Sequence, residues 1–370
     1  MNTLGVYIHV PFCASKCGYC SFHSAPAGKA EMQQYTEKIQ QAIAVSPYEY
    51  SGADTVYFGG GTPSLLAPQQ IIKCLEAVKQ RYPLTNDCEV TMEANPASIT
   101  AEKLDVLRNG GVNRLSIGIQ SLDDAQLKIL GRRHNAAQAC EAIIQAKQAG
   151  FNNISADLML GLPGQTKEHI KRFAEVLADL GVDHISSYIL KIEEGTPFER
   201  MNIAQQCPDE DECADIYLET VELLEKYGFK QYEISNFAKN GNISRHNTRY
   251  WKCMDYLGIG PSAHSFVKGE RFYFPADNAA FMSAEDVWNV ICSDGTGGDW
   301  EEYCMLALRL TEGIDLCEAK QKYPEAEWQR FINKTGIYIK NGYMQMQDNR
   351  LSFTPNGFLV SNDILASLLL

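Results

Sequence analysis

Six short apolar stretches alternate with amphipathic segments through the first two thirds of the chain, and this alternation constrains the fold more than any other feature. We predict strands over residues 4–10, 55–58, 88–93, 113–119, 154–160 and 184–190, with helices between them. Such alternation is typical of an α/β fold, in which helices cover a parallel sheet. Six units are too few for a complete eight-stranded barrel, so we expect a partial (β/α)6 barrel.

Polar residues gather where these predicted strands end. The first strand runs into a cysteine-rich loop and the second ends in three glycines. Glu93 ends the third strand, Gln120 follows the fourth, and Asp157 lies within the fifth. In barrels of this kind the active site collects at the carboxyl ends of the strands. The sequence therefore predicts that these groups meet in one mouth.

The cysteine-rich loop holds Cys13, Cys17 and Cys20, with no further cysteine before Cys74. Soft thiolate ligands select iron–sulfur clusters or zinc. A closed [4Fe–4S] site has four thiolates, so three would leave one iron open for chemistry. A zinc site completed by His9 or His23 is the alternative. For the other cysteines of the chain we expect ordinary packing in the core.

The turn Gly59-Gly60-Gly61-Thr62-Pro63 follows the second strand. Glycine lets a backbone turn tightly and approach a ligand, so this turn is a candidate binding loop, although an ordinary connection has the same composition. Asp157 lies in a strand otherwise suited to burial, and a buried charge needs a partner or a ligand. Arg132 or Arg133 is a plausible partner for it.

The chain has 370 residues, a formal net charge of −13, 45% hydrophobic residues and 21% charged residues. This balance argues against a nucleic-acid partner held by a general basic surface. We find no signal-peptide pattern and no apolar run long enough to span a membrane, and we expect a cytoplasmic protein with reduced cysteines.

The pattern changes in the last third of the chain. We expect the barrel to occupy residues 1–235, a bridging segment rich in asparagine, glycine and aromatic residues to occupy 236–282, and a small module to occupy 283–370. Short helices over 284–291, 300–310, 315–322 and 325–340, a hairpin turning at Asp348-Asn349 and a last helix predict an α+β, winged-helix-like module. Such a shape does not by itself imply DNA binding.

The cysteine loop, the glycine turn and the strand Asp157-Leu158-Met159-Leu160-Gly161-Leu162-Pro163 together resemble the radical S-adenosylmethionine superfamily, and within it the group around oxygen-independent coproporphyrinogen III dehydrogenase. The resemblance covers nearly the whole chain and implies a TIM-like partial barrel. It implies that Cys13, Cys17 and Cys20 hold a [4Fe–4S] cluster whose open iron takes S-adenosylmethionine, and that an electron donor serves this cluster. The positions matching the family's S-adenosylmethionine contacts are Tyr7, Gly60, Gly61, Thr62, Glu93, Gln120, Arg132 and Asp157.

Two departures point to one branch of this group. The dehydrogenases usually carry a further cysteine two residues after the motif, where this chain has Phe22, and they have a longer segment before the first strand. Both departures resemble the HemW-type haem chaperones, which bind haem and pass it to an acceptor protein. That function is our expectation, and the oxygen-independent decarboxylation of coproporphyrinogen III to protoporphyrinogen IX is the alternative. The acceptor is not readable from the sequence, and a haem-linked dimer is a family expectation.

The same branch is marked by the motif His246-Asn247-Thr248-Arg249-Tyr250-Trp251. A neutral imidazole is a common axial ligand of haem iron, so the resemblance implies His246 as the leading haem ligand, with His264 as a weaker candidate. From composition alone, a structural histidine packed among its aromatic neighbours is the competing interpretation.

Overall fold

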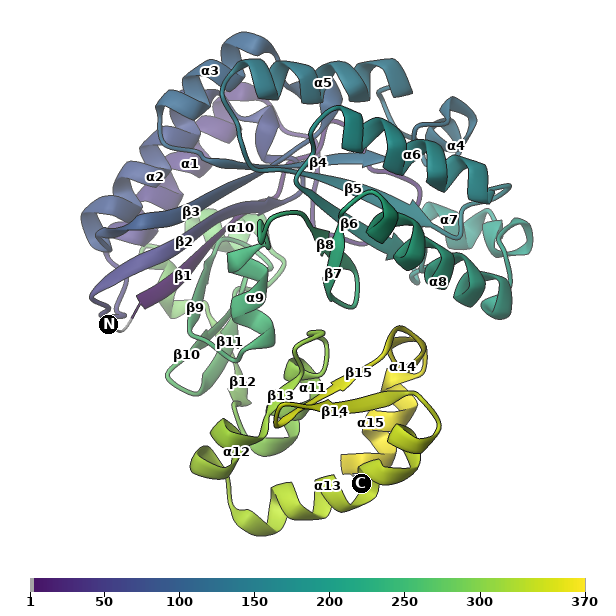
Figure 1. Ribbon diagram of the computed structural model, residues 1–370. Helices are drawn as coiled ribbons and strands as arrows, with labels where there is room; N and C mark the ends of the chain where they lie inside the picture. The colour runs from purple at the N-terminus through teal and green to yellow at the C-terminus, as the bar shows by residue number, and fades with distance from the viewer. Residues whose placement is uncertain (1–2, 370) are drawn as a thin grey trace.

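The computed structural model describes residues 3–369, and a single curved sheet of twelve strands dominates it (Figure 1). The central strands are β1 (Thr3–Val10), β2 (Gly52–Gly60), β3 (Leu84–Ala94), β4 (Arg114–Gln120), β5 (Ile154–Leu160) and β6 (His184–Ile189). They lie in chain order, and each pairs in parallel with the next. The predicted partial barrel is confirmed.

Helices cover the outer face of this sheet (Figure 1). They are α1 (Lys29–Ala44), α2 (Pro68–Arg81), α3 (Ala101–Asn109), α4 (Asp124–Ile129), α5 (Ala136–Gln148), α6 (Lys167–Asp179) and α8 (Glu210–Lys226). The short α7 (Pro197–Arg200) instead packs against the cysteine loop, where the N–H of Phe198 donates to the carbonyl of Gly18. On α2, Ile71, Leu75 and Val78 are buried against the sheet, as their helical spacing predicts. The apolar core lies between these helices and the strands, so the inner face of the sheet remains for polar groups.

Later parts of the chain add strands to both lateral edges of the parallel sheet, beside β6 and beside β1. At one end, β8 (Asn236–Ala238) pairs antiparallel with β6 and with β7 (Lys230–Glu233). At the other end, β9 (Tyr256–Ile259) pairs in parallel with β1, and β10 (His264–Val267), β11 (Glu270–Tyr273) and β12 (Cys292–Thr296) follow antiparallel. The segment predicted as a bridge thus supplies strands of the large sheet, and the sheet runs on to Thr296.

The helix α9 (Arg245–Trp251) lies between β8 and β9 and carries the His-Asn-x-x-Tyr-Trp motif. Instead of the helix predicted over 284–291, the chain forms α10 (Asn278–Ser283) and a short 3-10 turn, η4 (Val287–Asn289). Asp277 and Asp286 start these two elements, since each side chain accepts a hydrogen bond from a backbone N–H in the first turn, as N-cap residues do.

The small module is a separate α+β unit below the large sheet in Figure 1. It comprises α11 (Trp300–Ala307), β13 (Ile314–Asp315), α12 (Leu316–Lys322), α13 (Glu325–Lys340), β14 (Met344–Gln347), β15 (Arg350–Phe353), α14 (Pro355–Leu359) and α15 (Ser361–Leu369). Its core also takes in Tyr217 of α8, so the module packs against the barrel. The hairpin turns at Asp348 and Asn349, as predicted. Both residues have positive φ, as tight hairpin turns require. Within residues 3–369, no helix combines the length and apolar character that crossing a bilayer requires.

Candidate functional site

A cavity of about 400 Å³, here called the central cavity, opens at the carboxyl ends of the parallel strands. Most of the predicted site residues line it: Cys13, Cys17, Cys20, Gly60, Gly61, Thr62, Glu93, Gln120, Arg132 and Asp157. They come from the loop after β1 and from the ends or loops of β2, β3, β4 and β5. Parallel pairing places all these ends at one edge of the sheet, so residues far apart in sequence meet there.

The glycine turn is fixed to the cysteine loop by backbone hydrogen bonds. The N–H of Gly61 donates to the carbonyl of Val10 at 2.8 Å, and the N–H of Thr62 donates to the carbonyl of Phe12 at 2.7 Å. A Cβ atom at Gly61 would lie 2.6 Å from the Phe12 oxygen, so only glycine permits this approach. The Thr62 hydroxyl lies 3.2 Å from the Cys13 sulfur. The turn therefore sets the position of the loop that carries the thiols.

Two carboxylates face the central cavity from the sheet. Glu93 accepts hydrogen bonds from the Tyr57 hydroxyl at 2.8 Å and from the Gly60 N–H at 3.1 Å. Burial raises the pKa of Glu93 to about 7 in spite of these bonds. Burial likewise raises the pKa of Asp157 to about 6, while the Ser116 hydroxyl donates to Asp157 at 3.3 Å. Burial thus makes the charged form of both carboxylates costly, and a cationic ligand in the central cavity would offset that cost.

The arginine beside the thiols is Arg132. Its guanidinium lies 3.6 Å from the Cys17 sulfur and donates to the carbonyl of Gly118, and its Nε has no partner among the described residues. Arg133 faces away from the central cavity. Gln120 lines the central cavity with a φ of 70°, a backbone strain that glycine or asparagine would more readily adopt and that is often found at functional sites.

Tyr7 lies behind the wall of the central cavity and is not part of its lining. Its ring stacks on that of Tyr57 with centroids 6.0 Å apart, and its hydroxyl lies 3.2 Å from Nδ1 of His9. A contact between Tyr7 and S-adenosylmethionine therefore stays a prediction.

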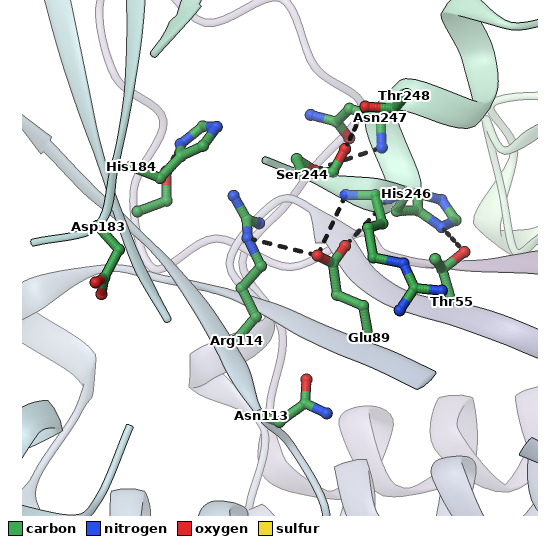
Figure 2. Close-up of polar contacts among 12 residues, drawn as sticks. Thr55, Glu89, Asn113, Arg114, Asp183, His184, Ser244, His246, Asn247 and Thr248 are labelled. Carbon is green, nitrogen blue, oxygen red and sulfur yellow. Dashed lines mark hydrogen bonds and ion pairs between the residues drawn. The ribbon is translucent and has the colours of Figure 1, made fainter. Parts of the chain in front are cut away.

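His246 does not face the central cavity either, and it is fully buried. Its Nδ1 lies 2.8 Å from the Thr55 hydroxyl (Figure 2). Its Nε2 lies 2.8 Å from the Tyr250 hydroxyl. Burial lowers the pKa of His246 to about 3, so the ring is neutral. Because both ring nitrogens are engaged in hydrogen bonds, neither is available to iron in this structure. The geometry corresponds to the structural-histidine interpretation, and His246 as the haem ligand stays a prediction.

Glu89 anchors the helix that bears His246. Its carboxylate oxygens accept hydrogen bonds from the backbone N–H groups of Arg245 at 3.2 Å and of His246 at 3.1 Å (Figure 2). A carboxylate at a helix N-terminus satisfies N–H groups that have no partner within the helix. Nε of the buried Arg114 lies 4.0 Å from the same carboxylate. Helix α9 is thus held against β3 and β4.

Sequence reasoning missed several groups that line the central cavity. Arg114 begins β4, and Asn247 follows the motif histidine. Phe22, Tyr188 and Ile189 are large apolar side chains of the same lining, and they are 65%, 43% and 40% exposed. The alternation of β4 places Arg114 on the same face as Ser116, and this was the available signal for it.

The donor set distinguishes a cluster from a single ion. In residues 3–369, no three histidine, cysteine, aspartate or glutamate side chains are arranged to hold one metal ion. His9 is bonded to Tyr7 and to the His23 carbonyl, and His23 is bonded to Asn278, so neither completes a tetrahedron with the thiols. Three thiols around one cavity fit a [4Fe–4S] cluster, because each thiolate there binds a different iron.

The fold has a close counterpart among solved structures. Coproporphyrinogen III oxidase (HemN) from Escherichia coli superimposes with a TM-score of 0.84 over 100% of this chain and 90% of that chain, at 20% sequence identity. Among family profiles, the radical SAM superfamily matches residues 7–177 and the HemN C-terminal domain matches residues 299–360. The fold and the site therefore define a radical SAM protein with a HemN C-terminal domain.

Relatives that align along the full length of the chain show which family within the radical SAM superfamily it belongs to. The chain is 32% identical over 378 residues to "Heme chaperone HemW" of Bacillus subtilis, covering 98% of both chains, and 33% identical over 377 residues to the protein of the same name in Haemophilus influenzae, covering 98% and 97%. The chain belongs to the HemW family. It is also 42% identical over 265 residues to "Radical S-adenosyl methionine domain-containing protein 1, mitochondrial" of Bos taurus, spanning 70% of this chain but only 60% of that relative.

Proposed function

We propose that this protein is a haem chaperone, which binds haem and passes it to an acceptor protein while carrying a [4Fe–4S] cluster and S-adenosylmethionine. The observation that carries the proposal is the similarity along the full chain to proteins named as haem chaperones. Phe22, in place of a further cysteine after the motif, is consistent with it.

The central cavity supports the two cofactors. Cys13, Cys17 and Cys20 would hold the cluster, and the glycine turn, Glu93, Gln120, Arg132 and Asp157 would surround S-adenosylmethionine. When bound, the cluster supplies an electron to the sulfonium of S-adenosylmethionine. Glu93 and Asp157 match this ligand in charge, because its sulfonium and its amine are both cationic.

Exposed apolar side chains in the lining of the central cavity favour the haem-binding part of the proposal. Phe22, Tyr188 and Ile189 offer exposed apolar surface of the kind that a flat macrocycle covers. Lys16 and Lys191 belong to the same lining, and ammonium groups bind carboxylates such as the haem propionates. Lys191 is paired with Glu193 at 2.8 Å, so a propionate would compete for it. We propose that haem lies against these side chains, and His246 as the ligand of its iron stays a prediction.

A haemin titration tests the proposal. Anaerobically reconstituted protein should bind haemin saturably, as seen in the Soret band, and the F22A/Y188A variant should bind about tenfold more weakly, because about 1.4 kcal/mol of apolar contact is lost. M201A is the matched control, since Met201 is 63% exposed but lies outside the cavity lining. If the wild-type protein does not bind haemin and instead converts coproporphyrinogen III to protoporphyrinogen IX anaerobically, the proposal is wrong and the protein is an enzyme.

A further inference from the structure

A second cavity of about 360 Å³ adjoins the central cavity at the cysteine loop, and we call it the outer cavity. Its lining includes Cys17, Lys103 and Arg133. Cys17 lines both cavities. The two cavities also share Ser15, Thr62 and Asn95, so they adjoin along the cysteine loop, and Cys17 connects the outer cavity to the proposed cluster.

The outer cavity carries positive charge on an acidic protein. Its lining includes two cations, Lys103 and Arg133, and no carboxylate, although the chain as a whole has a net charge of −13. The side chain of Arg133 is exposed and makes no hydrogen bond or ion pair within the described residues. A local cationic surface of this kind attracts an acidic partner and speeds its association.

Lys103 is held in a fixed position. Its ammonium donates to the carbonyl of Ser64 at 3.2 Å and to the carbonyl of Ser98 at 2.9 Å. An ammonium has three N–H donors, so one remains for a ligand. Partial burial lowers the pKa of Lys103, which shows that its charge is incompletely compensated. A carboxylate from outside would supply the missing compensation.

We propose that the outer cavity is the docking site of an acidic one-electron carrier protein, which places a surface carboxylate between Lys103 and Arg133. The electron then passes through Cys17 to the cluster. The carrier is oxidised by one electron, the cluster goes from the 2+ to the 1+ state, and no covalent bond forms or breaks. This inference rests on the proposed function only in requiring the cluster.

The rate of cluster reduction tests the electron path. Dithionite-reduced flavodoxin, an acidic carrier, is freed of excess dithionite and mixed with the cluster-loaded protein in a stopped-flow instrument, and the cluster absorbance is followed. We expect the K103E/R133E variant to be reduced about tenfold more slowly at low ionic strength. Salt at about 500 mM should slow the wild-type protein toward the variant, because it screens exposed charges.

Two controls separate docking from damage to the cluster. Photoreduced deazaflavin, a small reductant that needs no docking site, should reduce wild type and variant equally, and their iron contents should match. The K226E/K340E variant reverses two charges at the ends of α8 and α13, away from the cysteine loop, and should behave as wild type. Equal rates for K103E/R133E and wild type with flavodoxin would overturn the inference.

A calorimetric titration of oxidised flavodoxin into the cluster-free chain tests docking alone. We expect K103E/R133E to bind at least about fivefold more weakly than wild type, and equal affinities would also overturn the inference. This result does not depend on haem or on the cluster. A failure of docking is therefore distinguishable from a failure of the proposed chaperone function.

Discussion

The imidazole of His246 stacks on the phenol ring of Tyr57, with ring centroids 5.1 Å apart and planes inclined by 28°. The Tyr57 hydroxyl in turn donates to Glu93 in the central cavity. His246 therefore contacts the central cavity only indirectly, because it packs against Tyr57 and Tyr57 positions the Glu93 carboxylate. A residue in such a position affects folding and geometry before it affects ligand chemistry.

Replacing His246 should mainly destabilise the fold. We expect H246A to lower the free energy of unfolding by about 2–4 kcal/mol, because it leaves a cavity and removes the hydrogen-bond partner of two buried hydroxyls. Urea unfolding followed by circular dichroism measures this loss. Y250F, which removes only the Nε2 partner, should cost about 1 kcal/mol. A fully stable H246A protein that had lost its Soret band with haemin would instead support His246 as the haem ligand.

Replacing a cysteine of the loop should prevent cluster assembly. We expect C17S to retain far less than four irons per chain after anaerobic reconstitution, since the hydroxyl is a poor ligand for iron–sulfur clusters. Iron and acid-labile sulfide analysis measures the content. C317S, at an exposed cysteine of the small module, should load as wild type does. A C17S chain with a complete cluster would contradict the ligand assignment.

The close approach at Gly61 predicts a specific sensitivity. G61A places its Cβ within 3 Å of two backbone carbonyls, so the cysteine loop or the turn has to shift. We expect a loss of about 1–3 kcal/mol in stability and weaker binding of S-adenosylmethionine, measured by calorimetry on the reconstituted protein. G28A is the control, because nothing lies within 4 Å of the added methyl group. Equal binding by G61A and wild type would show that the turn does not form the ligand cradle.

The raised pKa of Glu93 predicts that replacing this residue stabilises the fold by an amount that depends on pH. Burial shifts this pKa from 4.5 to about 7, so the folded state binds the proton more tightly than the unfolded chain does. The contribution of Glu93 to stability is therefore present below pH 4.5 and is lost as the pH rises through 7. The stability of E93Q relative to wild type should increase between pH 5 and pH 8, by at most about 3 kcal/mol.

Thermal unfolding of the cluster-free proteins across this pH range measures that difference. E37Q, on an exposed face of α1, controls for the loss of one negative charge. A stability difference between E93Q and wild type that stays constant with pH would mean that Glu93 titrates as an ordinary solvated carboxylate.

The barrel was largely predictable because its signals are local. The strands predicted over 4–10, 154–160 and 184–190 agree within one residue with β1, β5 and β6, where each apolar stretch is short and well bounded. The helix over 284–291 was wrong, because Ala284 is extended and Asp286 starts a new turn after it. Within this stretch the N-cap residue Asp286 starts a new turn, and this outweighed the helical spacing of the apolar residues.

The site was predictable where it follows strand ends and unpredictable where it depends on distant packing. Glu93 and Asp157 could be placed because parallel strands share one edge. The burial of His246 depends on Thr55 and Tyr57, almost two hundred residues earlier in the chain, and no local pattern reports such a contact. The exposure of Phe22 and Tyr188 depends equally on what the finished fold leaves uncovered.

The parallel pairing of β9 with β1 has a consequence for how this protein can be divided. A chain shortened to end before residue 236 would leave the hydrogen-bonding edge of its first strand bare, and bare edges recruit other strands. We expect this shortened chain to aggregate and not to fold into a functional barrel domain. Evolution or engineering can therefore exchange the small module more readily than it can separate the barrel from the strands that close it.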